Sequence, residues 1–188
     1  MKVNGNTIKP GNVIEHKSGL WIAVKTSHVK PGKGGAFAQI ELRNLKDGTK
    51  LNERFRSSEN IERVILEESS FVFLYKEDDN LIFMNNQTFE QVNINEKMIG
   101  DQSAFLQDGM KVIINSYNDE PVSVNMPDTC IEEIVEADAV IKGQTASSSF
   151  KPAFLKNGVK VMVPGHIEVG TKIVVRPLDS TYVEKAKI

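Results

Sequence analysis

Hydrophobic and polar residues alternate along much of this 188-residue chain with a period of two. Residues 38–43, for example, read Ala-Gln-Ile-Glu-Leu-Arg, the pattern of a strand with one buried face. The 3.6-residue period of an amphipathic helix is nearly absent, and helix-like character is confined to residues 95–107. Strands are predicted at residues 13–16, 20–26, 36–45, 50–56, 71–75, 81–85, 88–94, 110–117, 121–125, 131–135, 159–163, 172–176 and 182–183.

Short turns connect these predicted strands, at residues 17–19, 46–48 and 76–80 among others. The pair Asp47-Gly48 predicts a tight hairpin turn in which the glycine takes a positive φ. Many short antiparallel strands at this spacing predict an all-β fold built from small barrels. Changes in charge near residues 65 and 128 divide the chain into three predicted domains, 1–65, 66–127 and 128–188, each close to the smallest size that folds alone.

The net charge of −2 hides an uneven distribution. Residues 1–65 hold 12 Lys/Arg and 6 Asp/Glu, residues 66–127 hold 3 and 11, and residues 128–188 hold 8 and 8. The basic first third predicts a polyanionic partner for that part, although chance clustering of solvated charges is the alternative. The acidic middle third argues against nucleic acid wrapping around the whole molecule.

Composition also bears on location and chemistry. No run of 18 apolar residues and no apolar N-terminal segment occur, so neither a membrane span nor a signal peptide is predicted. The single cysteine, Cys130, is expected to be a small buried or half-buried residue in a reducing, cytoplasmic compartment. The three histidines lie far apart and no catalytic motif is present, so we expect neither an enzyme nor a metal or cofactor site.

The segment His28–Phe37, HVKPGKGGAF, predicts a hairpin with Lys33 at its summit. The tip loop around this lysine consists of Lys30, Pro31, Gly32, Gly34 and Gly35. Glycines on both sides permit positive φ and leave Lys33 without bulky neighbours, so the side chain is expected to project into solvent. A Walker loop is rejected because Gly34, and not Ser or Thr, follows the lysine. An ordinary solvated hairpin tip is the simpler alternative.

Aromatic residues of the middle third raise the question of a base-stacking platform. They are Phe71, Phe73, Tyr75, Phe83 and Phe89. Core packing is the preferred interpretation for most of them, because an acidic domain would repel a phosphate backbone. Trp21 is likewise expected in a barrel core.

Three further segments resemble one known family: MNNQTFEQ at residues 84–91, KGQTASSSFKPA at 142–153 and KNGVKVMVPGHIEVG at 156–170. Together with the KPGKG tip, and in this order, they resemble bacterial translation elongation factor P from the first strand to Tyr182. The resemblance implies an SH3-like (KOW-like) barrel followed by two OB-fold barrels, in an elongated L shape similar in outline to transfer RNA. It also implies a monomer that does not bind membranes.

The same resemblance implies a function in translation. Such a factor binds both ribosomal subunits between the peptidyl and exit sites, beside the peptidyl-site tRNA, and relieves stalling at consecutive prolines. The tip reaches toward the peptidyl-transferase centre, and the equivalent of Lys33 commonly carries a modification added by a lysine-modifying enzyme. Arg54 and Arg56, with Lys30, are candidate contacts to the RNA backbone, and ordinary surface charge is their alternative.

The loop Gly143, Gln144, Thr145, Ala146 and Ser147 matches the family's small-subunit-facing loop, usually GDTAGT, which is thought to approach messenger RNA in the exit site. Gln144 replaces the usual Asp and can donate as well as accept hydrogen bonds. The resemblance therefore predicts where the loop lies and leaves base recognition by it open.

Two other functions compete with this one. The family's paralogue, the elongation factor P-like protein, is the first, and the lysine tip with the MNN-TFEQ segment favours the factor itself. A generic OB-fold protein that binds single-stranded RNA is the second, and it would show strongly salt-dependent binding to free RNA.

Overall fold

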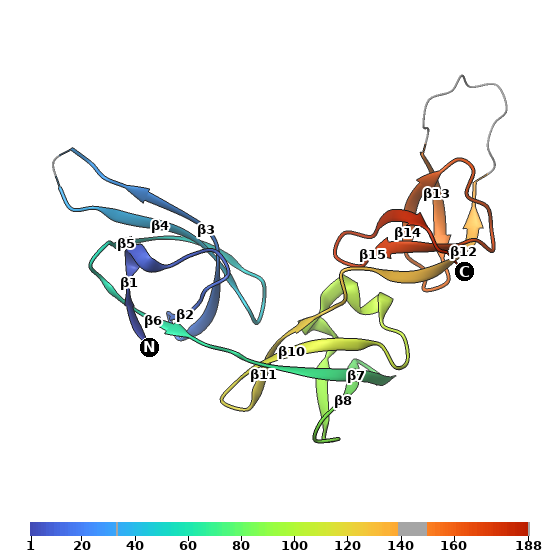
Figure 1. The fold of residues 1–188 in the computed structure, drawn as a ribbon, viewed down its shortest axis with the longest axis horizontal. Helices are drawn as coiled ribbons and strands as arrows, with labels where there is room; N and C mark the ends of the chain where they lie inside the picture. The colour runs from blue at the N-terminus through green and yellow to red at the C-terminus, as the bar shows by residue number, and fades with distance from the viewer. Residues whose placement is uncertain (33, 139–149, 188) are drawn as a thin grey trace. The chain divides into compact units, whose positions relative to one another are not determined.

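The structure of the protein is a computed structural model that describes residues 1–32, 34–138 and 150–187. The described residues form sixteen strands and three short 3₁₀ helices, η1 (Gly5–Thr7), η2 (Glu96–Met98) and η3 (Gly100–Phe105). No helix among them is long and apolar enough to cross a membrane. The fold is all-β, as predicted, and its strands form three sheets (Figure 1).

The first sheet has the order β1-β6-β2-β3-β4-β5. Its strands are β1 (Lys2–Asn4), β2 (Val13–His16), β3 (Gly19–Val29), β4 (Phe37–Asn44), β5 (Lys50–Arg56) and β6 (Asn60–Val64). The second sheet has the order β11-β10-β7-β8-β9. Its strands are β7 (Glu67–Glu77), β8 (Asn80–Asn85), β9 (Gln91–Asn95), β10 (Lys111–Tyr117) and β11 (Glu120–Asn125).

The third sheet has the order β14-β13-β12-β15-β16. Its strands are β12 (Cys130–Ala137), β13 (Phe150–Leu155), β14 (Lys160–Pro164), β15 (Lys172–Arg176) and β16 (Thr181–Lys185). The chain divides into two compact units, one of Met1–Ser69 with Ile114–Val124, the other of Ser70–Ile113 with Asn125–Ile188.

The first unit is built around an apolar core inside the first sheet. The core residues are Ile8, Ile14, Trp21, Ala23, Ala38, Ile40, Leu42, Phe55 and Ile61. Trp21 is 8% exposed, as expected, and its Nε1 donates a hydrogen bond to the His16 carbonyl at 2.8 Å. Gly5 packs η1 directly against β5, since a Cβ at this position would lie 2.7 Å from the Arg56 carbonyl oxygen. A small residue is therefore required beneath the strand that carries Arg54 and Arg56.

The second unit contains a core between the strands of the third sheet, and Phe105 of η3 is part of it. Next to this contact, Gln107 Nε2 donates to the Ile131 carbonyl and to Glu132 Oε1, both at 2.9 Å. Burial raises the pKa of the Glu132 carboxyl, although the Gln107 bond acts in the opposite direction. Cys130 is 8% exposed, as expected, and burial raises the pKa of its thiol to about 11.

Several predictions for individual elements need correction. The helix-like character predicted at residues 95–107 is confirmed by the 3₁₀ helices η2 and η3, whereas the strand predicted at 88–94 begins only at Gln91. Strands β1, β6 and β13 were not predicted from the sequence. In β13, Phe150 and Phe154 are exposed while Ala153 and Leu155 are buried, so apolar residues on both faces conceal the period of two.

The aromatic residues of the middle third divide into two groups. Phe71, Phe73 and Phe83 are buried, and the last two rings pack with centroids 5.4 Å apart, so core packing is confirmed for them. Tyr75 and Phe89 are 50% and 70% exposed, which contradicts a core role for these two.

Candidate nucleic-acid interface

Strands β3 and β4 form the long hairpin that leads to the predicted tip (Figure 1). They pair antiparallel as far as Val29 opposite Phe37, and the sequence between these two residues contains the KPGKG loop. Gly34 has φ +139°, a conformation that residues with a Cβ rarely adopt, whereas Gly32 is not among the glycines with positive φ. Of the two flanking glycines, only Gly34 is therefore required by its backbone conformation.

Alternation along β4 and β5 sends mostly apolar side chains inward and mostly polar side chains outward, with Glu53 and Phe37 among the exceptions. Ala38, Ile40 and Leu42 are fully buried and Phe55 is 5% exposed. The register pairs Gln39 with Arg54 and Arg43 with Lys50 on the opposite, outer side. On β3, Lys25 pairs with Glu41 and so joins the same side. We call this surface the basic face, and it consists of Lys25, Arg43, Lys50, Arg54 and Arg56 with one acid, Glu41.

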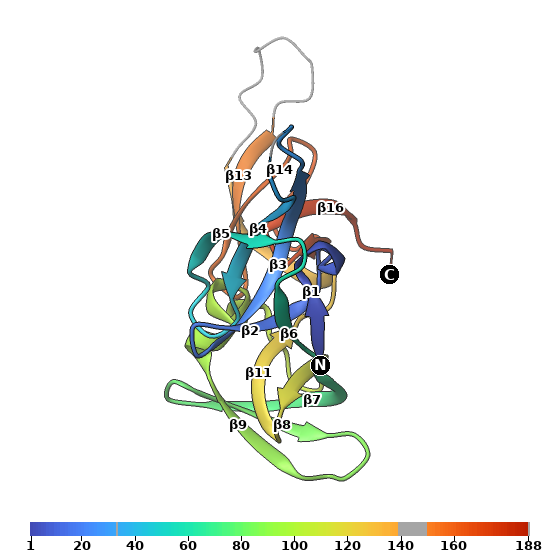
Figure 2. The same ribbon diagram turned by 90° about the vertical axis from the view of Figure 1, so that its left-hand side faces the viewer.

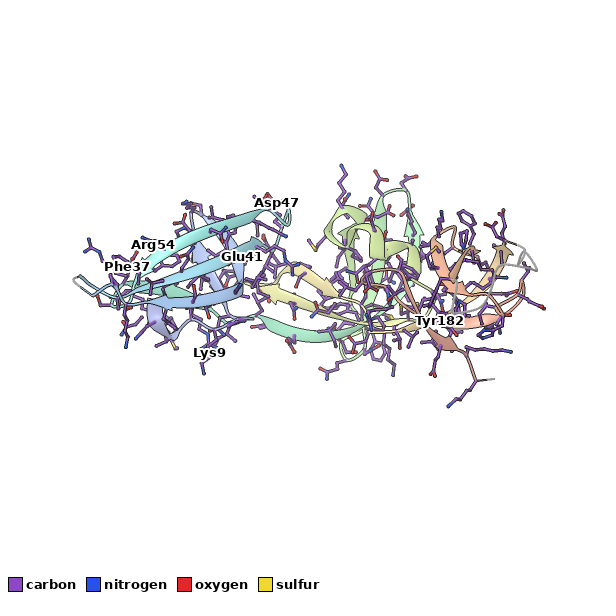
Figure 3. The ribbon with its side chains drawn as sticks, turned by 90° about the horizontal axis from the view of Figure 1, so that it is seen from above. Lys9, Phe37, Glu41, Asp47, Arg54 and Tyr182 are labelled. Atoms are coloured by element: carbon purple, nitrogen blue, oxygen red, sulfur yellow. The ribbon has the colours of Figure 1, made fainter. Side chains whose placement is uncertain are left out.

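Arg54 lies over the ring of Phe37, with its guanidinium carbon 5.7 Å from the ring centroid. Figure 3 shows the two side chains close together, at the opposite end of β4 and β5 from Asp47 in the turn that joins these strands. A cation over an aromatic face is held by the ring quadrupole, typically by about 0.5–1 kcal/mol at exposed sites. The contact orients the planar donor group of Arg54 without neutralising it, which leaves the guanidinium available for a phosphate.

Acidic partners do not cancel the charge of the basic face. None of its five cations takes part in an ion pair with any residue that the structure describes. Glu53 of β5 points to the other side, where it accepts from Lys17 Nζ and lies 3.4 Å from His16 Nε2. The hydrogen bond from Lys17 is the largest cause that holds the pKa of Glu53 below its ordinary value, against the opposing effect of burial. The outer side of the sheet is therefore a row of cations suited to a polyanion.

The structure locates part of the predicted site. Arg54 and Arg56 lie on neighbouring outward positions of β5, and Lys30, Pro31, Gly32, Gly34 and Gly35 flank the hairpin end. Lys33 itself lies outside the described residues, as do Gly143, Gln144, Thr145, Ala146 and Ser147.

Sequence reasoning missed three members of the basic face, Lys25, Arg43 and Lys50, and also the ring of Phe37 that orients Arg54. The period of two could have indicated Arg43 and Lys50, since it places them on the same face as Gln39 and Arg54. Lys25 could not have been found in this way, because an irregularity between Ala23 and Lys25 shifts the register of β3.

Comparison with known proteins identifies a family that matches nearly the whole chain, this hairpin included. Three family models match in succession: the elongation factor P KOW-like domain at residues 4–61, the elongation factor P OB domain at 66–124, and the elongation factor P C-terminal domain at 131–185. The chain belongs to the elongation factor P family. Elongation factor P of Parvibaculum lavamentivorans is 56% identical over 186 residues, 99% of this chain and 100% of that protein.

Other elongation factor P relatives are similarly close. That of Chelativorans sp. is 54% identical and that of Brucella canis 53% identical, each over 99% of this chain and 100% of its own length. Among solved structures, eukaryotic translation initiation factor 5A from Methanococcus jannaschii matches with a TM-score of 0.56 and 23% identity, covering 68% of this chain and 92% of that one. This structural likeness supports the barrel fold, and family membership supports a role as a translation elongation factor.

Proposed function

We propose that this protein binds the ribosome beside the peptidyl-site tRNA and promotes peptide-bond formation between consecutive prolines, with Lys33 at the working end. The observation that carries the proposal is the basic face, a row of unneutralised cations on the hairpin that ends in KPGKG. Membership of the elongation factor P family supports it further. Exit-site messenger RNA near residues 143–147 is part of the same proposal.

In this proposal the protein positions the tRNA and the nascent chain, and the ribosome performs the chemistry. The protein itself is therefore not an enzyme. Proline reacts slowly in peptide transfer because its ring fixes φ and constrains the approach of its secondary amine. Holding the tRNA and nascent chain in a productive geometry lowers the entropic part of that barrier. The basic face would bind RNA phosphates, and the ammonium of Lys33 would reach between phosphates and 2′-hydroxyls. A lysine-modifying enzyme that lengthens Lys33 would extend this reach.

Translation of a polyproline reporter with purified ribosomes tests the proposal. We expect Lys33→Ala to abolish the rescue given by the wild-type protein while changing the free energy of unfolding by less than about 0.5 kcal/mol, as for an exposed side chain. Lys9→Ala, which removes an exposed lysine of the first unit outside the basic face, is the matched control and should rescue normally (Figure 3). Equal rescue by Lys33→Ala and wild type would refute the assignment.

A further inference from the structure

Phe89 lies in the turn between β8 and β9 and combines two unusual properties. Its side chain is 70% exposed, more than any other aromatic side chain among the described residues. Its backbone has φ +61°, in the left-handed region where a bulky residue is rare. Stability alone would favour Asn or Gly at such a position. An exposed aromatic side chain in an unfavourable conformation therefore points to a contact outside the chain.

The turn that carries Phe89 is held in one shape by hydrogen bonds. We call residues 85–90 the Phe89 turn; Figure 2 shows it at the end of its sheet, between β8 and β9. Asn85 Oδ1 accepts from the backbone N–H groups of Gln87 and Thr88, at 2.8 and 3.1 Å. The Asn85 carbonyl accepts from the Phe89 N–H at 3.0 Å. The side chain thus starts from a fixed backbone, which lowers the entropy that a partner must remove on binding.

A second anchor ties the same turn to β7. Asn86 donates from its backbone N–H to the Ser70 carbonyl at 3.0 Å, and from Nδ2 to Ser70 Oγ at 2.7 Å. Both hydrogen bonds lie within the second unit. The turn is therefore fastened to β7 at its start and closed on itself by backbone bonds that include the Phe89 N–H, while the Phe89 side chain takes part in none of them.

The charge of the stretch that carries the Phe89 turn indicates the class of partner. Residues 70–113 hold seven Asp/Glu and three Lys; Glu77, Asp78, Asp79 and Glu96 lie at the opposite end of β8 and β9, and Glu90 is the acid of the turn itself. Glu90, next to Phe89, is exposed. A phosphate backbone would be repelled here, so a base stacked on the ring is disfavoured. A basic protein surface with an apolar pocket would match both the charge and the ring.

We propose that Phe89 is an anchor that inserts into an apolar pocket on a positively charged protein surface of the ribosome. The inference rests on the proposed function, which supplies the ribosome as the partner. It concerns the second unit, whereas the basic face belongs to the first, and its partner is a protein surface, whereas the basic face is suited to RNA.

Site-specific crosslinking tests the partner class. Phe89 is replaced by p-benzoylphenylalanine in the full-length chain, which is then irradiated with purified ribosomes carrying peptidyl-tRNA. We expect a crosslink to a ribosomal protein that is sensitive to protease and resistant to ribonuclease. The same crosslinker at Tyr75, the other exposed aromatic residue on this sheet, should give less than about a tenth of the yield. Crosslinking to ribosomal RNA, or equal yields at both positions, would overturn the proposal.

A substitution separates binding from folding. Phe89→Asn suits the left-handed conformation better, so we expect the variant to melt at the same temperature or higher while its affinity for the loaded ribosome falls about tenfold. Phe89→Tyr, which keeps an aromatic ring, should retain most of the affinity. If Phe89→Asn bound the loaded ribosome with the same affinity as the wild-type protein, this inference would be refuted and the proposed function would be unaffected. Failure of the wild-type protein to bind ribosomes would overturn both.

Discussion

The two hairpins that present candidate contacts, β3–β4 and β8–β9, are built in opposite ways. The first carries a row of five cations, and its one oriented aromatic ring, Phe37, serves to hold Arg54. The second lies in an acidic part of the chain and presents one aromatic side chain on a turn that is closed by hydrogen bonds. Long-stemmed cations adapt to a polyanion and lose strength with salt, whereas a fixed aromatic residue needs a matching pocket. The two proposed surfaces therefore differ in the kind of partner that each would recognise.

The largest effect that this comparison predicts is a preference for the loaded ribosome over free RNA. The basic first third and the acidic middle third partly cancel in attraction to an isolated strand, while a ribosome can match both surfaces. We expect affinity for ribosomes carrying peptidyl-tRNA to exceed affinity for single-stranded RNA by at least about 100-fold, or about 2.7 kcal/mol, at physiological salt. Titration of labelled protein with both partners measures this. Tight binding to free RNA without preference would favour the generic RNA-binding alternative.

Charge reversal on the basic face should have the next largest effect. We expect Arg54→Glu combined with Arg56→Glu to lower ribosome affinity by at least about tenfold and to make binding less sensitive to salt, since phosphate contacts release counterions. Lys9→Glu is the control for nonspecific attraction, because Lys9 belongs to the first unit and not to the basic face. If Lys9→Glu weakened ribosome binding as much as Arg54→Glu alone, the net charge of the protein, and not the basic face, would explain the attraction.

A smaller effect is expected at the tip. Because Gly34 has φ +139°, Gly34→Ala should strain the loop by about 1 kcal/mol and reduce polyproline rescue more than it reduces the melting temperature. Gly32→Ala should be close to wild type, since its φ is not positive and nothing lies within 4 Å of an added Cβ. Rescue assays and thermal unfolding of both variants check this. Equal loss in the two variants would show that positive φ is not what matters at the tip.

The sequence predicted the first sheet better than it predicted the Phe89 turn. In that sheet β2 and β5 have the predicted bounds, and Gly48 between β4 and β5 takes the expected positive φ of +73°, because a strict period of two and a glycine turn are local signals. The position of Phe89 was not predictable in the same way. Thr88 and Phe89 read as the start of a strand, but Asn85 Oδ1 accepts hydrogen bonds from the backbone N–H groups of Gln87 and Thr88 and keeps this segment in a turn.

The basic face was predicted only in part for a related reason. Arg54 and Arg56 were identified from their type and neighbourhood, whereas Lys25 joins the face through strand pairing across a register shift. Strand pairing depends on tertiary structure, and no pattern within one strand records it. The missing information therefore concerned which strands lie side by side, and not which residues carry charge.

The smallest expected effect comes from removing one negative charge from either side of the first sheet and comparing the two variants. Glu41→Gln removes the one acid of the basic face and should strengthen ribosome binding about twofold, since repulsion of phosphate is relieved. Glu53→Gln removes an acid from the opposite side and should leave binding unchanged. It should lower the free energy of unfolding at neutral pH by less than about 1 kcal/mol, through loss of the Lys17 pair.

The pH dependence of these variants provides a check on that reasoning. The pKa of Glu53 is lowered in the folded protein, so its pair stabilises the fold above the carboxyl's ordinary pKa of 4.5, and this stabilisation is lost as the pH falls through the folded pKa. Urea unfolding of wild type and Glu53→Gln should therefore converge on acidification. Ribosome affinity of the two variants is then compared. If Glu53→Gln raised the affinity by the same factor as Glu41→Gln, total charge, and not the face that carries it, would govern the interaction.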